Sequence, residues 1–108
     1  VAGYQEMGTT RLGFNTDSPV IPQEELQLQA AMGVRYGFDN KNMDAVRGLT
    51  IVPAMACGLG DAVGSIEVGK IADLIVITGD PADPRSYVKH VWQSGETVYD
   101  TKEEPRLW

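Results

Sequence analysis

The sequence predicts an α/β fold, with helices in its first part and short β-strands in its second. Residues 23–57 carry apolar side chains at helical spacing, with glycine and proline where helices begin and end. After Gly60, glycines instead separate short apolar runs, which is typical of strands joined by turns. A third observation is the apolar run at residues 12–14, which stops at Asp17 and is consistent with a buried strand.

The first two helices are predicted from their stop signals. Residues 1–7 have the pattern of a helix end, and Gly8 follows them. The main helix is expected over residues 23–32, because its apolar positions cluster on one broad side. Two glutamates in its first turn complement the helix dipole, and Gly33 is expected to end it.

Two shorter helices are expected next along the chain. One is predicted over residues 43–49, with Asn42 as its cap. The other begins after Thr50, a second predicted cap, and carries a proline in its first turn, where the missing N–H costs nothing. Cys57 closes this helix and is expected to be a small core residue.

The second part of the chain is predicted to hold three strands. The first covers residues 72–78. Residues 88–93 and 97–99 are expected to form a hairpin around a turn at residues 94–95. The charged tail, residues 102–108, is expected to be peripheral.

Composition excludes several function classes. The 108 residues are 43% apolar and 22% charged, which is ordinary for a globular domain. The net charge is −6 and no two of the nine basic residues are adjacent, so no nucleic-acid partner is expected. No apolar run approaches the roughly 18 residues of a membrane span, so no membrane partner is expected either. The single cysteine excludes an internal disulfide and is compatible with a reducing, cytoplasmic location.

Two motifs carry a resemblance to a known family. Residues 64–76 read Gly-Ser-Ile-Glu-Val-Gly-Lys-Ile-Ala-Asp-Leu-Ile-Val, and residues 15–19 read Asn-Thr-Asp-Ser-Pro. Together they resemble the C-terminal end of a metal-dependent amidohydrolase, in the branch of imidazolonepropionases and prolidase-like peptidases. The resemblance implies that residues 1–60 form the last strand and following helices of a (β/α)8 barrel. It implies that residues 61–108 form part of a composite β-sandwich.

The resemblance assigns the chemistry to Asp17. A (β/α)8 barrel carries its catalytic groups at the C-terminal ends of strands, where Asp17 would follow a strand at residues 12–14. The family role is metal ligand and proton shuttle in the hydrolysis of a C–N bond, in a cyclic amide, a dipeptide or a deaminable ring. Thr16 and Ser18 could orient the carboxylate and Asn15 could contact substrate. The spacing by itself favours a turn or cap role for Asp17, and only the downstream motif at residues 64–76 reverses that preference.

The metal expectations follow from the same resemblance. The intact enzyme is expected to bind a divalent metal, zinc first among the candidates. This chain alone is expected to bind none, because a catalytic zinc needs about three protein ligands. His90 is the only histidine, and an exposed strand position is expected for it rather than metal ligation.

Partners are expected because the predicted strands have free edges. The resemblance supplies the first partner, the N-terminal part of the same enzyme, together with a small-molecule substrate. A homo-oligomer is the second expectation. The alternative function is non-catalytic: a scaffold or interaction module that keeps the sandwich and has no barrel.

Overall fold

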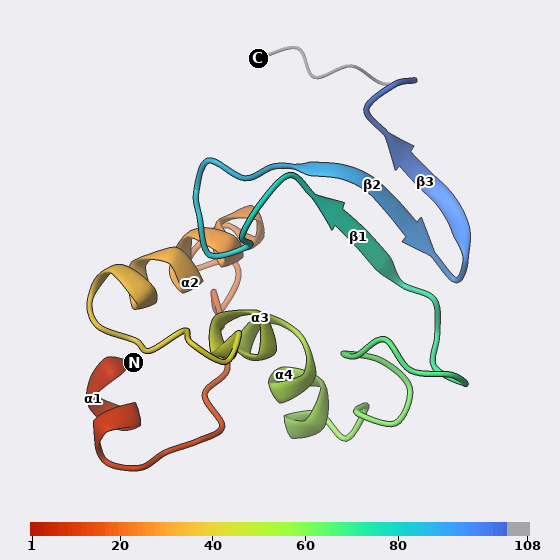
Figure 1. Ribbon diagram of the computed structural model, residues 1–108. Helices are drawn as coiled ribbons and strands as arrows, with labels where there is room; N and C mark the ends of the chain where they lie inside the picture. The colour runs from red at the N-terminus through yellow and green to blue at the C-terminus, as the bar shows by residue number, and fades with distance from the viewer. Residues whose placement is uncertain (104–108) are drawn as a thin grey trace.

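The computed structural model describes residues 1–103, in which helices gather on one side and a sheet lies on the other (Figure 1). The helical elements are α1 (Ala2–Glu6), the 3₁₀ turn η1 (Gln23–Glu25), α2 (Leu26–Arg35), α3 (Asp44–Leu49) and α4 (Ile51–Ala56). The strands are β1 (Leu74–Ile77), β2 (Val88–Gln93) and β3 (Glu96–Asp100). Within these residues, every helix is too short or too polar to cross a membrane. The predicted tail covers residues 102–108, of which residues 104–108 lie outside the described residues.

The main helix overlaps its predicted range, residues 23–32, but residues 23–25 form the 3₁₀ turn η1 and the α-helix does not end at Gly33. It runs on to Arg35, and the chain turns at Gly37, whose φ is 99°. Gly33 has a packing role instead. A Cβ atom there would lie 3.0 Å from the ring of Phe14, so only glycine lets this ring approach the helix closely.

The predicted caps of the two shorter helices are wrong in detail. The N–H of Ala45 in the first turn of α3 donates to Oδ1 of Asn40 at 2.9 Å, so Asn40 rather than Asn42 satisfies it. Thr50 precedes α4 as predicted. Its hydroxyl, however, donates to the carbonyl of Val46 at 2.7 Å and caps nothing. Cys57 is exposed rather than in the core, because the last turn of α4 points to solvent.

Residues 12–14 do not form the predicted strand in the part of the chain that the structure describes. The N–H of Phe14 donates to the carbonyl of Gly48 in α3 at 3.0 Å, where a sheet neighbour would otherwise bind it. The sheet of this chain is remote in sequence and lends no strand to this segment. A strand here would need neighbours that residues 1–103 do not supply.

The hydrophobic core is small and lies among the helices. Phe14 and Phe38 are its two large members, and each is less than a tenth exposed. Four alanines complete the buried apolar set: Ala30, Ala31, Ala45 and Ala82. Ala82 comes from the loop between β1 and β2. The amide of Gln27 in α2 holds this loop by donating to the carbonyls of Asp83 and Ser86.

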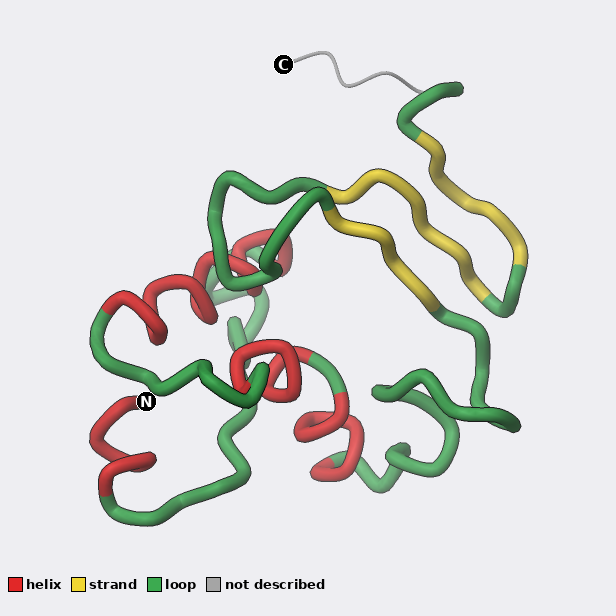
Figure 2. Tube along the Cα trace, in the orientation of Figure 1, coloured by secondary structure: helices red, strands yellow, loops and turns green. Residues whose placement is uncertain are grey.

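The sheet is antiparallel, with the order β1-β2-β3 (Figure 2). The predicted hairpin is confirmed: Ser94 and Gly95 both have positive φ, at 51° and 84°, as a tight two-residue turn requires. Asp73 supports this turn, because its Oδ1 accepts the N–H of Ser94 at 2.8 Å. No helix among the described residues makes more than a marginal contact with the sheet.

The segment before β1 is organised around Lys70. Its ammonium group donates to the carbonyl of Gly60 and to the hydroxyl of Ser65, both at 2.6 Å. It also pairs with Glu67 at 3.2 Å, and the Lys70 side chain is only 11% exposed. Hydrogen bonds from Ser65 and, to a smaller extent, from Lys70 lower the pKa of Glu67. This lysine of the family motif therefore closes a loop of the fold.

Candidate active-site loop

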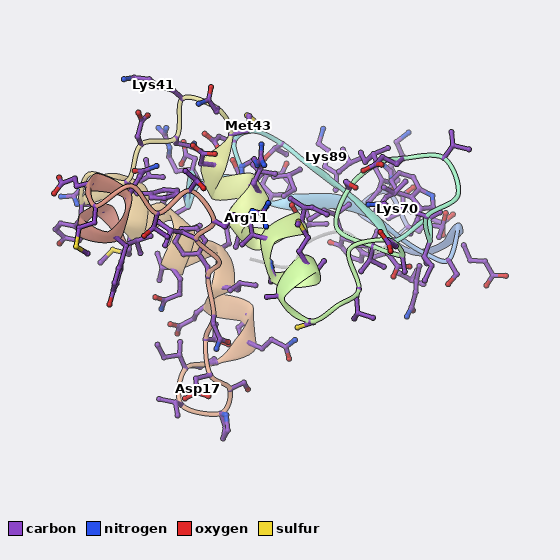
Figure 3. All side chains as sticks on the ribbon, turned by 90° about the horizontal axis from the view of Figure 1, so that it is seen from below. Arg11, Asp17, Lys41, Met43, Lys70 and Lys89 are labelled. Atoms are coloured by element: carbon purple, nitrogen blue, oxygen red, sulfur yellow. The ribbon has the colours of Figure 1, made fainter. Side chains whose placement is uncertain are left out.

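The candidate site is the loop that follows Phe14. Figure 3 shows Asp17 at the tip of this loop, projecting away from the rest of the chain and far from the labelled Arg11 and Lys70. Asp17 is exposed and has a φ of 51°, in the left-handed region. Aspartate is one of the few residues that adopts this region readily, because its short polar side chain can bond locally.

Hydrogen bonds hold the main chain of the loop on both sides of Asp17. The N–H of Asp17 donates to Oδ1 of Asn15 at 3.0 Å, and its carbonyl accepts the N–H of Val20 at 2.9 Å. The N–H of Ile21 donates to the carbonyl of Thr16 at 3.3 Å. Thr16 is only 6% exposed, so the loop is anchored one residue before the carboxylate.

The predicted site residues divide into two kinds. Asn15, Asp17 and Ser18 are exposed, whereas Thr16 is buried. The side chain of Asn15 accepts a hydrogen bond from the main chain of Asp17. An asparagine two residues before a turn position is a sequence signal for this kind of side-chain turn, so the bond could have been predicted. Among residues 1–103, no hydrogen bond or ion pair engages the Asp17 carboxylate, and neither hydroxyl beside it orients it. Roles of Asn15 and Ser18 toward a substrate stay predictions.

The described residues do not form a complete metal centre. No group of three or more histidine, cysteine or acidic side chains in residues 1–103 could hold a metal ion. Asp17 offers one carboxylate, and a catalytic zinc site takes about three protein ligands and a water. Residues 1–103 therefore do not supply the ligands of a catalytic zinc by themselves.

His90 differs from its predicted exposed position. Its side chain is 27% exposed, and its Nδ1 lies 3.3 Å from Oδ2 of Asp100 on the neighbouring strand. Its ring stacks on that of Trp92, with centroids 5.5 Å apart. These contacts fix His90 within the hairpin, which explains its partial burial.

A groove of about 350 Å³ lies elsewhere, between α2 and the loop that joins β1 to β2. Leu28, Met32 and Arg35 line one side, and Asp83 and Pro84 line the other. Asp17 is not among its lining residues, so this groove and the candidate loop are separate features.

Comparison with known proteins gives the family. The model of the amidohydrolase family matches residues 6–100, so this chain belongs to the amidohydrolase family. Imidazolonepropionase of Sphingopyxis alaskensis is 39% identical over 77 residues, which are 68% of this chain and 19% of that protein. The resemblance carried by residues 15–19 and 64–76 is thereby confirmed.

Two solved structures share the fold. An amidohydrolase of Thermotoga maritima has a TM-score of 0.69 at 44% identity, covering 78% of this chain and 21% of its own. A candidate prolidase of Bifidobacterium longum has a TM-score of 0.75 at 28% identity, covering 91% of this chain and 25% of its own. The chain thus spans a quarter or less of the length of these relatives.

Proposed function

We propose that this chain supplies the catalytic carboxylate, Asp17, of an amidohydrolase that cleaves C–N bonds by metal-activated water. The observation that carries the proposal is the contrast between the main chain and the side chain of Asp17. The main chain is held by Asn15 and Val20, whereas the carboxylate is exposed and, within residues 1–103, unengaged. A catalytic group must reach the reacting atom in a fixed geometry, which requires a fixed backbone and a side chain free to contact the substrate. Asp17 has both.

In this proposal Asp17 acts as general base and then as general acid. Its carboxylate takes a proton from the attacking water and returns that proton to the nitrogen of the leaving amine. The carboxylate is thus restored at the end of the cycle. Asp17 also offers an oxygen ligand to a divalent metal, with zinc the first candidate. When bound in the intact enzyme, the metal would supply an activated water and polarise the scissile group.

The other parts of the site would come from the rest of the intact enzyme. This chain covers a quarter or less of the length of its relatives, so most of the intact enzyme lies outside it. A catalytic zinc needs about three protein ligands, of which Asp17 would be one. Residues 1–60 would then end the barrel, and residues 61–108 would contribute to a composite β-sandwich. The relatives named above support a cyclic amide or a proline dipeptide as substrate classes, because one is an imidazolonepropionase and one a candidate prolidase.

The test is Asp17→Asn in the whole enzyme that carries this chain. Asparagine keeps the size and local bonding of the loop but cannot shuttle a proton, so kcat should fall by about 10²–10⁴-fold. Asp61→Asn is the matched control, because Asp61 is an exposed acid outside the loop. Its kcat should be unchanged. If Asp17→Asn kept more than about a tenth of the wild-type kcat, the general-base role would be excluded.

A further inference from the structure

The left-handed conformation of Asp17 depends on one neighbouring side chain. An L-amino acid prefers negative φ, and the φ of 51° at Asp17 is favoured only by local bonds. Among residues 1–103, three hydrogen bonds hold the loop. Two of them join main-chain groups, Val20 to Asp17 and Ile21 to Thr16. The third runs from the N–H of Asp17 to Oδ1 of Asn15, so it is the one that a side-chain substitution removes.

Packing within the described chain does not replace this bond. Asp17 lies at the tip of the loop (Figure 3), and Asn15 and residues 17–20 are exposed. No other acceptor in residues 1–103 binds the N–H of Asp17. Without Oδ1 of Asn15, this N–H would turn to water, and φ would be free to return to the usual negative range.

The main-chain conformation of Asp17 determines where its carboxylate can lie. The aspartate side chain is short, so a change of φ moves the whole carboxylate together with the Cβ atom. A general base must lie within hydrogen-bond reach of the proton that it takes. A misplacement of about 1 Å can lower a rate by about 10²-fold. A bond that fixes φ at Asp17 therefore affects the rate although it touches no reacting atom.

We propose that Asn15 is a positioning residue, which acts on the reaction through the main chain of Asp17 and not by contact with the substrate. This inference rests on the proposed role of Asp17 as general base. The side-chain oxygen of Asn15 already accepts the N–H of Asp17. Loss of this bond should lower kcat, which depends on the placement of the carboxylate, and should leave KM nearly unchanged.

The test measures kcat and KM of variants of the whole enzyme that carries this chain. Asn15→Ala removes the acceptor and should lower kcat about tenfold or more, with KM changed less than about twofold. Asn15→Ser keeps an uncharged acceptor that supports the same kind of turn more weakly, so its kcat should exceed that of the alanine variant by about threefold or more. Asn42→Ala is the matched control, because Asn42 is an exposed loop asparagine whose side chain forms no hydrogen bond within residues 1–103. It should change neither constant.

A double-mutant cycle shows whether Asn15 acts through Asp17. In the Asp17→Asn background no base is left to position, so adding Asn15→Ala should lower kcat further by less than about twofold. An additive loss in the double variant would overturn the inference. A wild-type kcat in Asn15→Ala, a serine variant no better than alanine, or a rise in KM without a fall in kcat would overturn it as well.

These outcomes are separable from a failure of the proposed function. If Asp17→Asn loses activity while Asn15→Ala keeps it, Asp17 is still the base and only the role of Asn15 is excluded. If Asp17→Asn itself stays active, the proposed function fails and the positioning role fails with it. Circular dichroism of each variant gives the folded fraction, and kcat is taken per folded molecule. A loss of folded enzyme is then not counted as a loss of positioning.

Discussion

The ring of Phe14 meets the ring of Phe38 edge to face, with centroids 5.7 Å apart and planes at 87°. Aromatic pairs prefer this geometry because the positive edge of one ring faces the negative face of the other. Two glycines, Gly33 and Gly48, leave room for Phe14 on the sides of α2 and α3. Because Asp17 follows three residues later, this packing fixes the point from which the candidate active-site loop departs.

Gly48→Ala should destabilise the fold by about 1–3 kcal/mol, as expected for overpacking of a core. The new Cβ would lie 2.7 Å from the carbonyl oxygen of Leu12 and 2.9 Å from the Phe14 ring. Gly3→Ala is the control, since α1 leaves its Cβ position open and alanine favours helix by up to about 1 kcal/mol. Urea unfolding measures both. Equal stability of the two variants would contradict this account of the core.

Lys70→Met should destabilise the fold by about 1.5–3 kcal/mol, the range for a hydrogen bond to a charged group. Methionine keeps the length of the side chain but leaves the carbonyl of Gly60 and the hydroxyl of Ser65 without their donor. Lys41→Met is the control, because the Lys41 side chain is 85% exposed and, within residues 1–103, its ion pair is with the exposed Asp39. It should change the free energy of unfolding by less than about 0.5 kcal/mol. A similar loss in both variants would remove the structural role of Lys70.

The pKa of Asp83 should depend on Arg85. The side-chain hydrogen bond from Arg85 lowers the pKa of Asp83 from 3.8 to about 2. Because the pKa falls on folding, the pair stabilises the fold at pH values above about 4, and this contribution is lost as the pH falls through about 2. NMR titration should show the Asp83 pKa rising most of the way back in Arg85→Gln. Arg11→Gln should leave it unchanged, since Arg11 forms no ion pair with Asp83 within residues 1–103.

The isolated chain should hydrolyse no amide and bind far less than one equivalent of zinc. Asp17 offers a single carboxylate, and residues 1–103 contain no cluster of three potential ligands. Elemental analysis of the purified chain, with and without chelator dialysis, measures this directly. Stoichiometric zinc that a chelator removes together with activity would contradict the proposal that the other ligands come from the rest of the enzyme.

Local signals in the sequence located most of the secondary structure. The hairpin was predicted from Ser94 and Gly95, because a tight two-residue turn needs positive φ at both positions and few residue pairs adopt it readily. α2 and α4 followed from apolar spacing and from a proline in a first turn. The family also followed from the sequence, because residues 64–76 and 15–19 are short, contiguous motifs.

Only the tertiary structure decided what each of these residues contacts. Gly33 looks like a helix stop in sequence, yet it lies inside α2 because the Phe14 ring, 19 positions earlier, packs against it. Lys70 looks like a turn lysine, yet three groups bury its ammonium. Residues 12–14 have a strand-like sequence, but a strand needs a neighbouring strand with free hydrogen-bonding groups. The N–H of Phe14 instead donates to the carbonyl of Gly48 near the end of α3. Apolar spacing and turn residues act locally, whereas these outcomes depend on side chains that folding brings together from distant positions.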